Sequence, residues 1–108
     1  MRLTKKLTLQ IGLEEWAWCK ATGRPKHEWP GWKIHGMMKH ACSFCEYGMR
    51  KKQGGHCLNC PIYKRFGGCY STYYVNWEGA KTDEDRMYYA GLFLEQLETL
   101  SAEESWRL

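Results

Sequence analysis

Four of the six cysteines in this sequence form two Cys-x-x-Cys pairs, and these pairs are the residues best suited to chemistry. Two thiolates separated by two residues can bind one ion from a tight turn, and a second pair completes the tetrahedron that Zn²⁺ prefers. In a reducing compartment, clustered cysteines are better explained by a metal than by disulfides. The spacing therefore predicts one structural zinc ion with four ligands, Cys42, Cys45, Cys57 and Cys60.

A fifth cysteine leaves the ligand set open. Cys69 follows the flexible pair Gly67-Gly68, so it could replace one of the four predicted ligands. Replacement of a ligand by His40 or His56 is a further alternative. An iron–sulfur cluster is less favoured than zinc, because the compact Cys-x-x-Cys-x-x-Cys run of ferredoxins is absent.

The residues around the second pair predict a helix that begins at the metal. Pro61 suits the first turn of a helix, and Gly67 stands where a short helix would end. The glycines between the two pairs provide the turn freedom of a hairpin. Knuckle, hairpin and helix in this order resemble the treble-clef class of zinc modules over about residues 42–67. The expected fold is mainly α, a small metal-stabilised α+β protein in which helices flank a treble-clef-like zinc module with four cysteine ligands.

An apolar stripe predicts the first flanking helix over residues 8–22. Leu13 and Trp16 belong to a set of apolar residues that recur at helical spacing. Glu15 is expected on another face of this helix. Cys19 is interpreted as a small apolar side chain buried against the neighbouring tryptophans.

The second flanking helix is predicted over residues 82–100. Thr82 is followed by three acidic residues, a pattern typical of an N-cap with negative charge in the positive first turn. Three shorter elements are expected: a helix over 32–39 with Ile34, Met37 and Met38 turned inward, a strand or ordered crossing segment over 70–77, and a terminal helix over 101–108. The predicted organisation is one domain, 1–108, containing the helix 8–22, the Cys-rich metal module 42–69 and the helix 82–100.

Charge is segregated along the chain more than the net charge of +4 suggests. Residues 20–65 carry ten basic and two acidic side chains, whereas residues 78–108 carry three and eight. Such a basic block can bind nucleic acid or an acidic protein, or it can be a solvated face balanced by the acidic tail. Six basic residues are the candidate phosphate contacts: Lys39, Arg50, Lys51, Lys52, Lys64 and Arg65.

The sequence offers no catalytic constellation. No H-x-E motif precedes either cysteine pair, and no Walker loop, nucleophile elbow or HExxH motif is present. Two pairs without an alternating strand and helix pattern also disfavour thioredoxin-like redox catalysis. We therefore expect a protein that is not an enzyme, with a zinc-dependent nuclease or deaminase as the remaining catalytic alternative.

The order of these features resembles a set of small cysteine-rich, zinc-binding proteins carried by bacteriophages and prophages. The shared features are a Trp-bearing first helix, the link Trp29-Pro30-Gly31-Trp32, the two cysteine pairs, Pro61, Gly68-Cys69, Trp77 and a final amphipathic helix. The resemblance implies a metal-stabilised fold and carries no assigned activity.

The leading functional hypothesis is a non-enzymatic binding or regulatory module that docks on a host or phage protein. Six Trp and seven Tyr are more than a small core needs, and both residue types are common interface anchors. The alternative is a nucleic-acid-binding zinc protein that uses the basic segment 39–65. No stretch resembles a secretory signal or the run of about twenty apolar residues of a membrane span. We therefore expect no membrane partner and a cytoplasmic location, in the host cell if the protein is phage-encoded.

Overall fold

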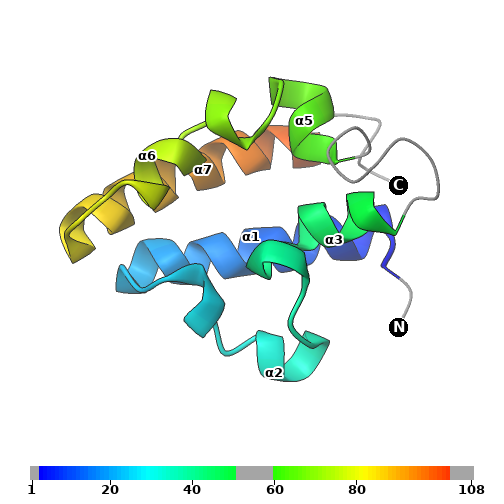
Figure 1. Cartoon of the computed structure of the whole chain (residues 1–108), viewed down its shortest axis with the longest axis horizontal. Coiled ribbons are helices and arrows are strands. Elements are labelled where there is room, and N and C mark those ends of the chain that lie inside the picture. Colours follow the sequence, from blue (N-terminus) through cyan, green and yellow to red (C-terminus); the bar gives the residue numbers. More distant parts are fainter. Residues whose placement is uncertain (1–2, 51–59, 103–108) are drawn as a thin grey trace.

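The computed structural model describes residues 3–50 and 60–102, which form helices joined by short loops (Figure 1). The longest helices are α1 (Lys5–Thr22) and α7 (Asp83–Ala102). Between them lie, in chain order, η1 (Lys26–Glu28), α2 (Trp32–His35), η2 (Lys39–Ala41), α3 (Ser43–Met49), α5 (Pro61–Phe66), η3 (Cys69–Ser71) and α6 (Tyr74–Glu78). Within the described ranges, no helix is long and apolar enough to cross a membrane.

The expected α+β fold with a treble-clef module is wrong. Residues 3–50 and 60–102 contain no β-strand. The same residues contain no group of three or more histidine, cysteine or acidic side chains arranged to hold a metal ion. The reason is local, because a Cys-x-x-Cys pair also spans about one helical turn, and Cys42 is the N-cap of α3. Most of the predicted hairpin falls on residues 51–59, outside the described part of the chain.

Helix α1 confirms the predicted helix over residues 8–22 and begins earlier. Its first turn is capped by Thr4, whose Oγ1 accepts a hydrogen bond from the Leu7 N–H at 3.1 Å. At the other end Gly23 adopts the left-handed conformation, with φ of 70°, and its N–H donates to the Cys19 carbonyl at 2.9 Å. Glycine suits this position because it has no Cβ to clash there.

Helices α1 and α7 run antiparallel and side by side (Figure 1). Arg86 Nε donates to the Gly23 carbonyl at 2.6 Å, which joins the end of α1 to the start of α7. Helices α3, α5 and α6 complete the main apolar cluster around this pair. Its buried members are Leu9, Trp16, Cys19, Phe44, Cys60, Ile62, Trp77, Ala90, Phe93, Leu97 and Leu100.

A second apolar cluster covers another side of α1. Its buried members are Leu3, Ile11, Trp29, Trp32, Met38, Ala41 and Tyr47. The rings of Trp29 and Trp32 meet edge to face with centroids 5.0 Å apart, across the predicted Pro-Gly turn. The Trp32 indole Nε1 donates to the Lys26 carbonyl at 2.9 Å, so its polar atom is satisfied. Helix α1 is therefore buried on two sides.

The short helix predicted over residues 32–39 is only partly correct. Helix α2 ends after one turn because Gly36 leaves the helical conformation, with φ of 82°. Ile34 and Met37, which were expected to face inward, are 82% and 60% exposed. Met38 is buried as expected, because the chain turns back toward α1 after Gly36.

The strand considered for residues 70–77 is wrong, since this segment forms η3 and α6. Tyr74 and Trp77 are three residues apart, so a helical turn places their rings on one face, with centroids 5.7 Å apart. Helix α7 begins as predicted, with the Asp85 N–H donating to Thr82 Oγ1 at 3.1 Å. It continues to Ala102 without a break, and the rest of the predicted terminal helix lies outside the described residues.

Two glycine substitutions test the packing of α1. A Cβ on Gly12 would lie 2.5 Å from a ring carbon of buried Phe44, whereas a Cβ on Gly91 of α7 would meet the flexible Lys20 side chain at 3.5 Å. We expect Gly91→Ala to raise the free energy of unfolding by about 0.5–1 kcal/mol through helix propensity. Gly12→Ala should lower it by about 1–2 kcal/mol through overpacking. Urea denaturation followed by circular dichroism measures both, and a stabilised Gly12→Ala protein would contradict the close contact.

Candidate metal centre and the adjoining cavity

The first cysteine pair is placed by the start of α3. His40 and Ala41 both adopt the left-handed conformation, with φ of 56° and 48°, and turn the chain immediately before Cys42. Such a conformation costs a non-glycine residue on the order of 1 kcal/mol, so surrounding contacts must offset it. One of these contacts is buried: Ser43 Oγ donates to the Thr8 carbonyl of α1 at 2.8 Å.

The second pair is represented by Cys60, which is the N-cap of α5. Pro61 occupies the first turn and Gly67 ends the helix in the left-handed conformation, so the predicted helix after the second pair is confirmed. The Ile62 and Tyr63 N–H groups donate to the Cys60 sulfur. Its partner Cys57 lies outside the described residues.

The described cysteines of the two helix starts lie against each other. The Cys45 thiol hydrogen-bonds to the sulfurs of Cys42 and Cys60. This hydrogen bonding lowers the pKa of both acceptors and raises the pKa of Cys45. Burial opposes ionisation of Cys42. The Lys26 ammonium and the Cys45 and Phe44 N–H groups favour ionisation and help to bring its pKa to about 6.

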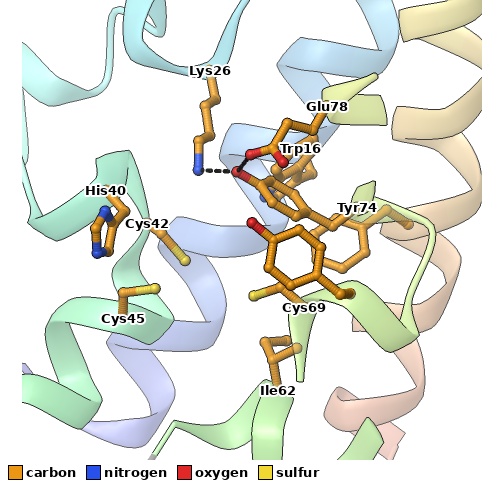
Figure 2. A pocket seen from close by; sticks show the side chains of 11 residues that line it. Trp16, Lys26, His40, Cys42, Cys45, Ile62, Cys69, Tyr74 and Glu78 are labelled. Atoms are coloured by element: carbon orange, nitrogen blue, oxygen red, sulfur yellow. Dashed lines mark hydrogen bonds between the residues drawn. The ribbon is translucent and has the colours of Figure 1, made fainter. Parts of the chain in front are cut away.

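Cys69 lines the same cavity as Cys42 and Cys45, from the opposite side. Figure 2 shows its side chain facing the space onto which Cys42 and Cys45 also open. Gly67 and Gly68 have φ of 91° and 131°, so the glycine pair makes the turn that brings Cys69 to this position. His40, the alternative ligand, lines the same cavity.

Thiolate donors suit zinc, although the described cysteines are not arranged as a group of three around one metal position. Sulfur ligands bind zinc as thiolates, and backbone N–H groups aimed at Cys42 and Cys60 stabilise that form. When bound, zinc would supply a fixed crosslink between the starts of α3 and α5. Cys42, Cys45 and Cys60 are the described residues that would hold it, and Cys57 and Cys69 are the candidates for the fourth position.

The cavity has a volume of about 240 Å³ and lies between the cysteines and the main core. One of its walls is aromatic. Lys26, Tyr74 and Glu78 form a hydrogen-bonded chain at its edge (Figure 2). Its lining residues are Trp16, Lys26, His40, Cys42, Cys45, Ile62, Cys69, Tyr70, Tyr74, Glu78 and Phe93.

Tyr74 is the centre of the polar edge of this cavity. Its hydroxyl accepts a hydrogen bond from Lys26 Nζ at 2.8 Å and donates to Glu78 Oε2 at 3.1 Å. The ammonium also lies 4.6 Å from the centroid of the Tyr74 ring. Burial and the Glu78 carboxylate raise the pKa of Tyr74, so it remains a neutral phenol.

Glu15 is the buried acid that the sequence reasoning placed on the wrong face. It is 1% exposed, and neither carboxylate oxygen has a hydrogen-bond partner in the described structure. Burial, and then the Cys42 charge, raise its pKa well above the ordinary value, so that the protonated form is favoured. The sequence does carry a signal for the burial of Glu15. Ile11, Glu15 and Cys19 are spaced four residues apart, which places all three on one buried face of the helix.

The candidate phosphate contacts are only partly available. Glu46 accepts from Arg50 Nε at 2.9 Å and from the Lys39 backbone N–H at 2.8 Å. Burial disfavours ionisation of Glu46, but these two partners outweigh it and lower its pKa. Lys64 and Arg65 lie in the last turn of α5, and Lys51 and Lys52 lie outside the described residues. The nucleic-acid hypothesis stays a prediction.

Comparisons with protein-family models, with curated proteins and with solved structures gave no match.

The buried carboxyl of Glu15 predicts a pH-dependent stability. Between its ordinary pKa and its raised folded pKa, the folded chain keeps a proton that the unfolded chain releases, so the free energy of unfolding falls as pH rises. Glu15→Gln removes this dependence. We expect its stability relative to the native protein to increase from pH 5 to pH 8, measured by urea denaturation. The exposed neighbour Glu14→Gln is the matched control and should show no such change, and equal pH profiles for both variants would contradict the assignment.

Proposed function

We propose that this protein is a non-enzymatic binding module whose fold is stabilised by one structural zinc ion and whose partner is a protein. The observation that carries the zinc proposal is the hydrogen bonding of Cys45 to the sulfurs of Cys42 and Cys60, which links two helix starts although the described residues do not surround one metal position. A fourth thiolate, predicted to be that of Cys57, would fill the tetrahedron and leave no open position for a substrate. The metal would then act on the fold alone.

The structural role follows from where the ligands lie. Cys60 is 4% exposed and belongs to the main core together with Phe44 of α3 and Ile62 of α5. A metal crosslink here would fix α3 and α5 against each other and against α1. Structural zinc sites contribute folding free energy on the order of 10 kcal/mol.

A protein partner is supported by exposed tyrosines of η3, of the N-cap of α6 and of α7, with the half-buried Tyr89 beneath them. We call Tyr70, Tyr73, Tyr88 and Tyr89 the tyrosine surface. Tyr70 and Tyr88 are 71% and 62% exposed. Tyr73 stacks on Tyr89, which meets Tyr88 edge-on, and Tyr70 and Tyr73 border the same shallow depression. Exposed tyrosines are frequent anchors of protein interfaces.

The resemblance to proteins carried by bacteriophages and prophages supports a phage or host protein as the partner, in the host cytoplasm. A membrane partner receives no support from the described helices. The basic residues support the nucleic-acid alternative less, because the Arg50 side chain is paired with Glu46.

Elemental analysis of the purified protein tests the metal. We expect one zinc per chain, with zinc lost in Cys42→Ser, Cys45→Ser and Cys60→Ser and retained in Cys19→Ser, because Cys19 lies inside the apolar core of α1. Chelation should lower the melting temperature by more than about 10 °C, since the site contributes several kcal/mol to folding.

Parallel analysis of Cys57→Ser and Cys69→Ser identifies the fourth ligand. The variant that loses zinc is the one whose substituted cysteine is the fourth ligand. The other variant should retain one zinc per chain. Protein purified without zinc, or with zinc unaffected by the Cys42, Cys45 and Cys60 substitutions, would refute the metal centre. Iron with visible charge-transfer absorption would indicate the cluster alternative instead.

Affinity capture from bacterial and phage-infected lysates tests the partner surface. We expect Tyr70→Ser combined with Tyr88→Ser to reduce capture of the specific partner at least tenfold, because the tyrosines lose their contact area. Ile34→Ser combined with Met37→Ser is the matched control, since it removes equally exposed apolar side chains from the α2 side. Equal capture by both double variants would show that the tyrosine surface is not the interface.

A further inference from the structure

The cavity beside the cysteines has the size of a site for a single-ring ligand. Its volume is about 240 Å³, and a cavity of about 150 Å³ already holds a benzene ring. Drug-sized ligands occupy pockets of about 300 Å³ or more, so this cavity fits one ring with small substituents. Three of its lining residues, His40, Tyr70 and Glu78, are exposed, so the cavity opens to solvent beside them.

One wall of the cavity is a preformed aromatic surface. Trp16 of α1, Tyr74 of α6 and Phe93 of α7 meet with ring centroids 4.8–5.9 Å apart. Each ring touches the other two, and Trp16 and Phe93 are buried in the main core, so the wall keeps its shape without a ligand. The rings meet edge to face or tilted, with interplanar angles of 86°, 84° and 54°, so a planar ligand can lie flat against one of them and contact the edges of the others.

Lys26 and Glu78 give the same cavity a hydrogen-bond donor and an acceptor side by side. Both are held by the Tyr74 hydroxyl, at 2.8 and 3.1 Å, as Figure 2 shows. An ammonium has three N–H groups and a carboxylate accepts several hydrogen bonds, so each keeps capacity for a ligand. Their positions are fixed before any ligand enters, which lowers the entropic cost of binding.

The charges around the cavity favour a neutral ligand. The positive Lys26 and the negative Glu78 lie together and largely cancel, so neither an anion nor a cation gains a large net attraction from the pair. The electron-rich sulfur atoms of Cys42 and Cys45 on the facing side add no attraction for an anion. A neutral ring whose edge carries a donor beside an acceptor can satisfy both side chains at once.

We propose that this cavity binds a neutral heteroaromatic ring of the pyrimidine-base class, which packs on the Trp16–Tyr74–Phe93 wall and presents its donor and acceptor edge to Lys26 and Glu78. This inference goes beyond the proposed binding module. The side chains that would contact the ring are neither proposed zinc ligands nor members of the tyrosine surface, although Cys42, Cys45 and Tyr70 line the same cavity.

Calorimetric titration of the full-length protein with cytosine tests the site. We expect a dissociation constant between about 10 µM and 1 mM, the range for a ring-sized ligand. Lys26→Met and Glu78→Gln should each weaken cytosine binding at least tenfold. Lys33→Met and Glu84→Gln remove the same charges from exposed positions that do not line the cavity, and should leave it unchanged. Melting curves confirm that each variant is folded. If Lys26→Met does not fold, the Glu78→Gln variant decides the outcome.

Two further probes separate the cavity's chemistry from simple hydrophobic filling. Benzene has the ring without a polar edge, and benzoate has the ring with a negative charge. Cytosine binding at least tenfold tighter than either supports the proposal. Benzoate or benzene binding as tightly as cytosine overturns it. Absence of cytosine binding at its solubility limit, or equal losses in the cavity and control variants, overturns it as well.

Discussion

The contacts of Trp16 with Trp77 and Phe93, each at 4.8 Å between ring centroids, join three helices from the two ends of the chain. Trp16 of α1 belongs to the main apolar cluster, and Trp18 of the same helix packs against both apolar clusters. Rings of this size bury a large apolar area in few residues, which suits a chain with little aliphatic surface to spare. The aromatic contacts therefore determine where α6 and α7 lie.

The same arrangement brings the chemically active side chains together. Helix α1 carries Glu15 on the face that α3 approaches, so a buried acid comes close to the thiol of Cys42. Helix α6 carries Tyr74 to Lys26, and the ammonium then faces the cysteines. A dense group of polar and sulfur atoms thus borders an aromatic core. In such surroundings electrostatic interactions act over a low effective dielectric constant, which is why the pKa shifts gather here.

The proposed zinc ion and the aromatic core would stabilise different helices of the fold. The core fixes α1, α6 and α7, while α3 and α5 are short helices that bury few residues of their own. A helix of six or seven residues is marginal in isolation, so it depends on tertiary contacts or on a crosslink at its start. The cysteines stand at these starts, where a metal would add the most to the order of the chain.

Much of the local structure could be predicted from the sequence. The apolar spacing around Trp16, the cap at Thr82, and the proline and glycine that bound α5 act within a few residues, so these elements follow from local rules. The cysteine spacing predicts that Cys42, Cys45, Cys57 and Cys60 share one metal ion, and this stays a prediction; among the described members, Cys45 hydrogen-bonds with Cys42 and Cys60.

Only the tertiary structure decided the rest. A Cys-x-x-Cys pair fits both a knuckle and a helical turn, and the packing of Phe44 on α1 selects the helix for the first pair. The aromatic run 70–77 has β propensity, but burial of Trp77 against Trp16 favours a helical turn. Glu15, Lys26, Tyr74 and Glu78 are far apart in sequence, so no local pattern could bring them to one region of the fold. Their neighbours are set by long-range packing, which the order of residues does not reveal by itself.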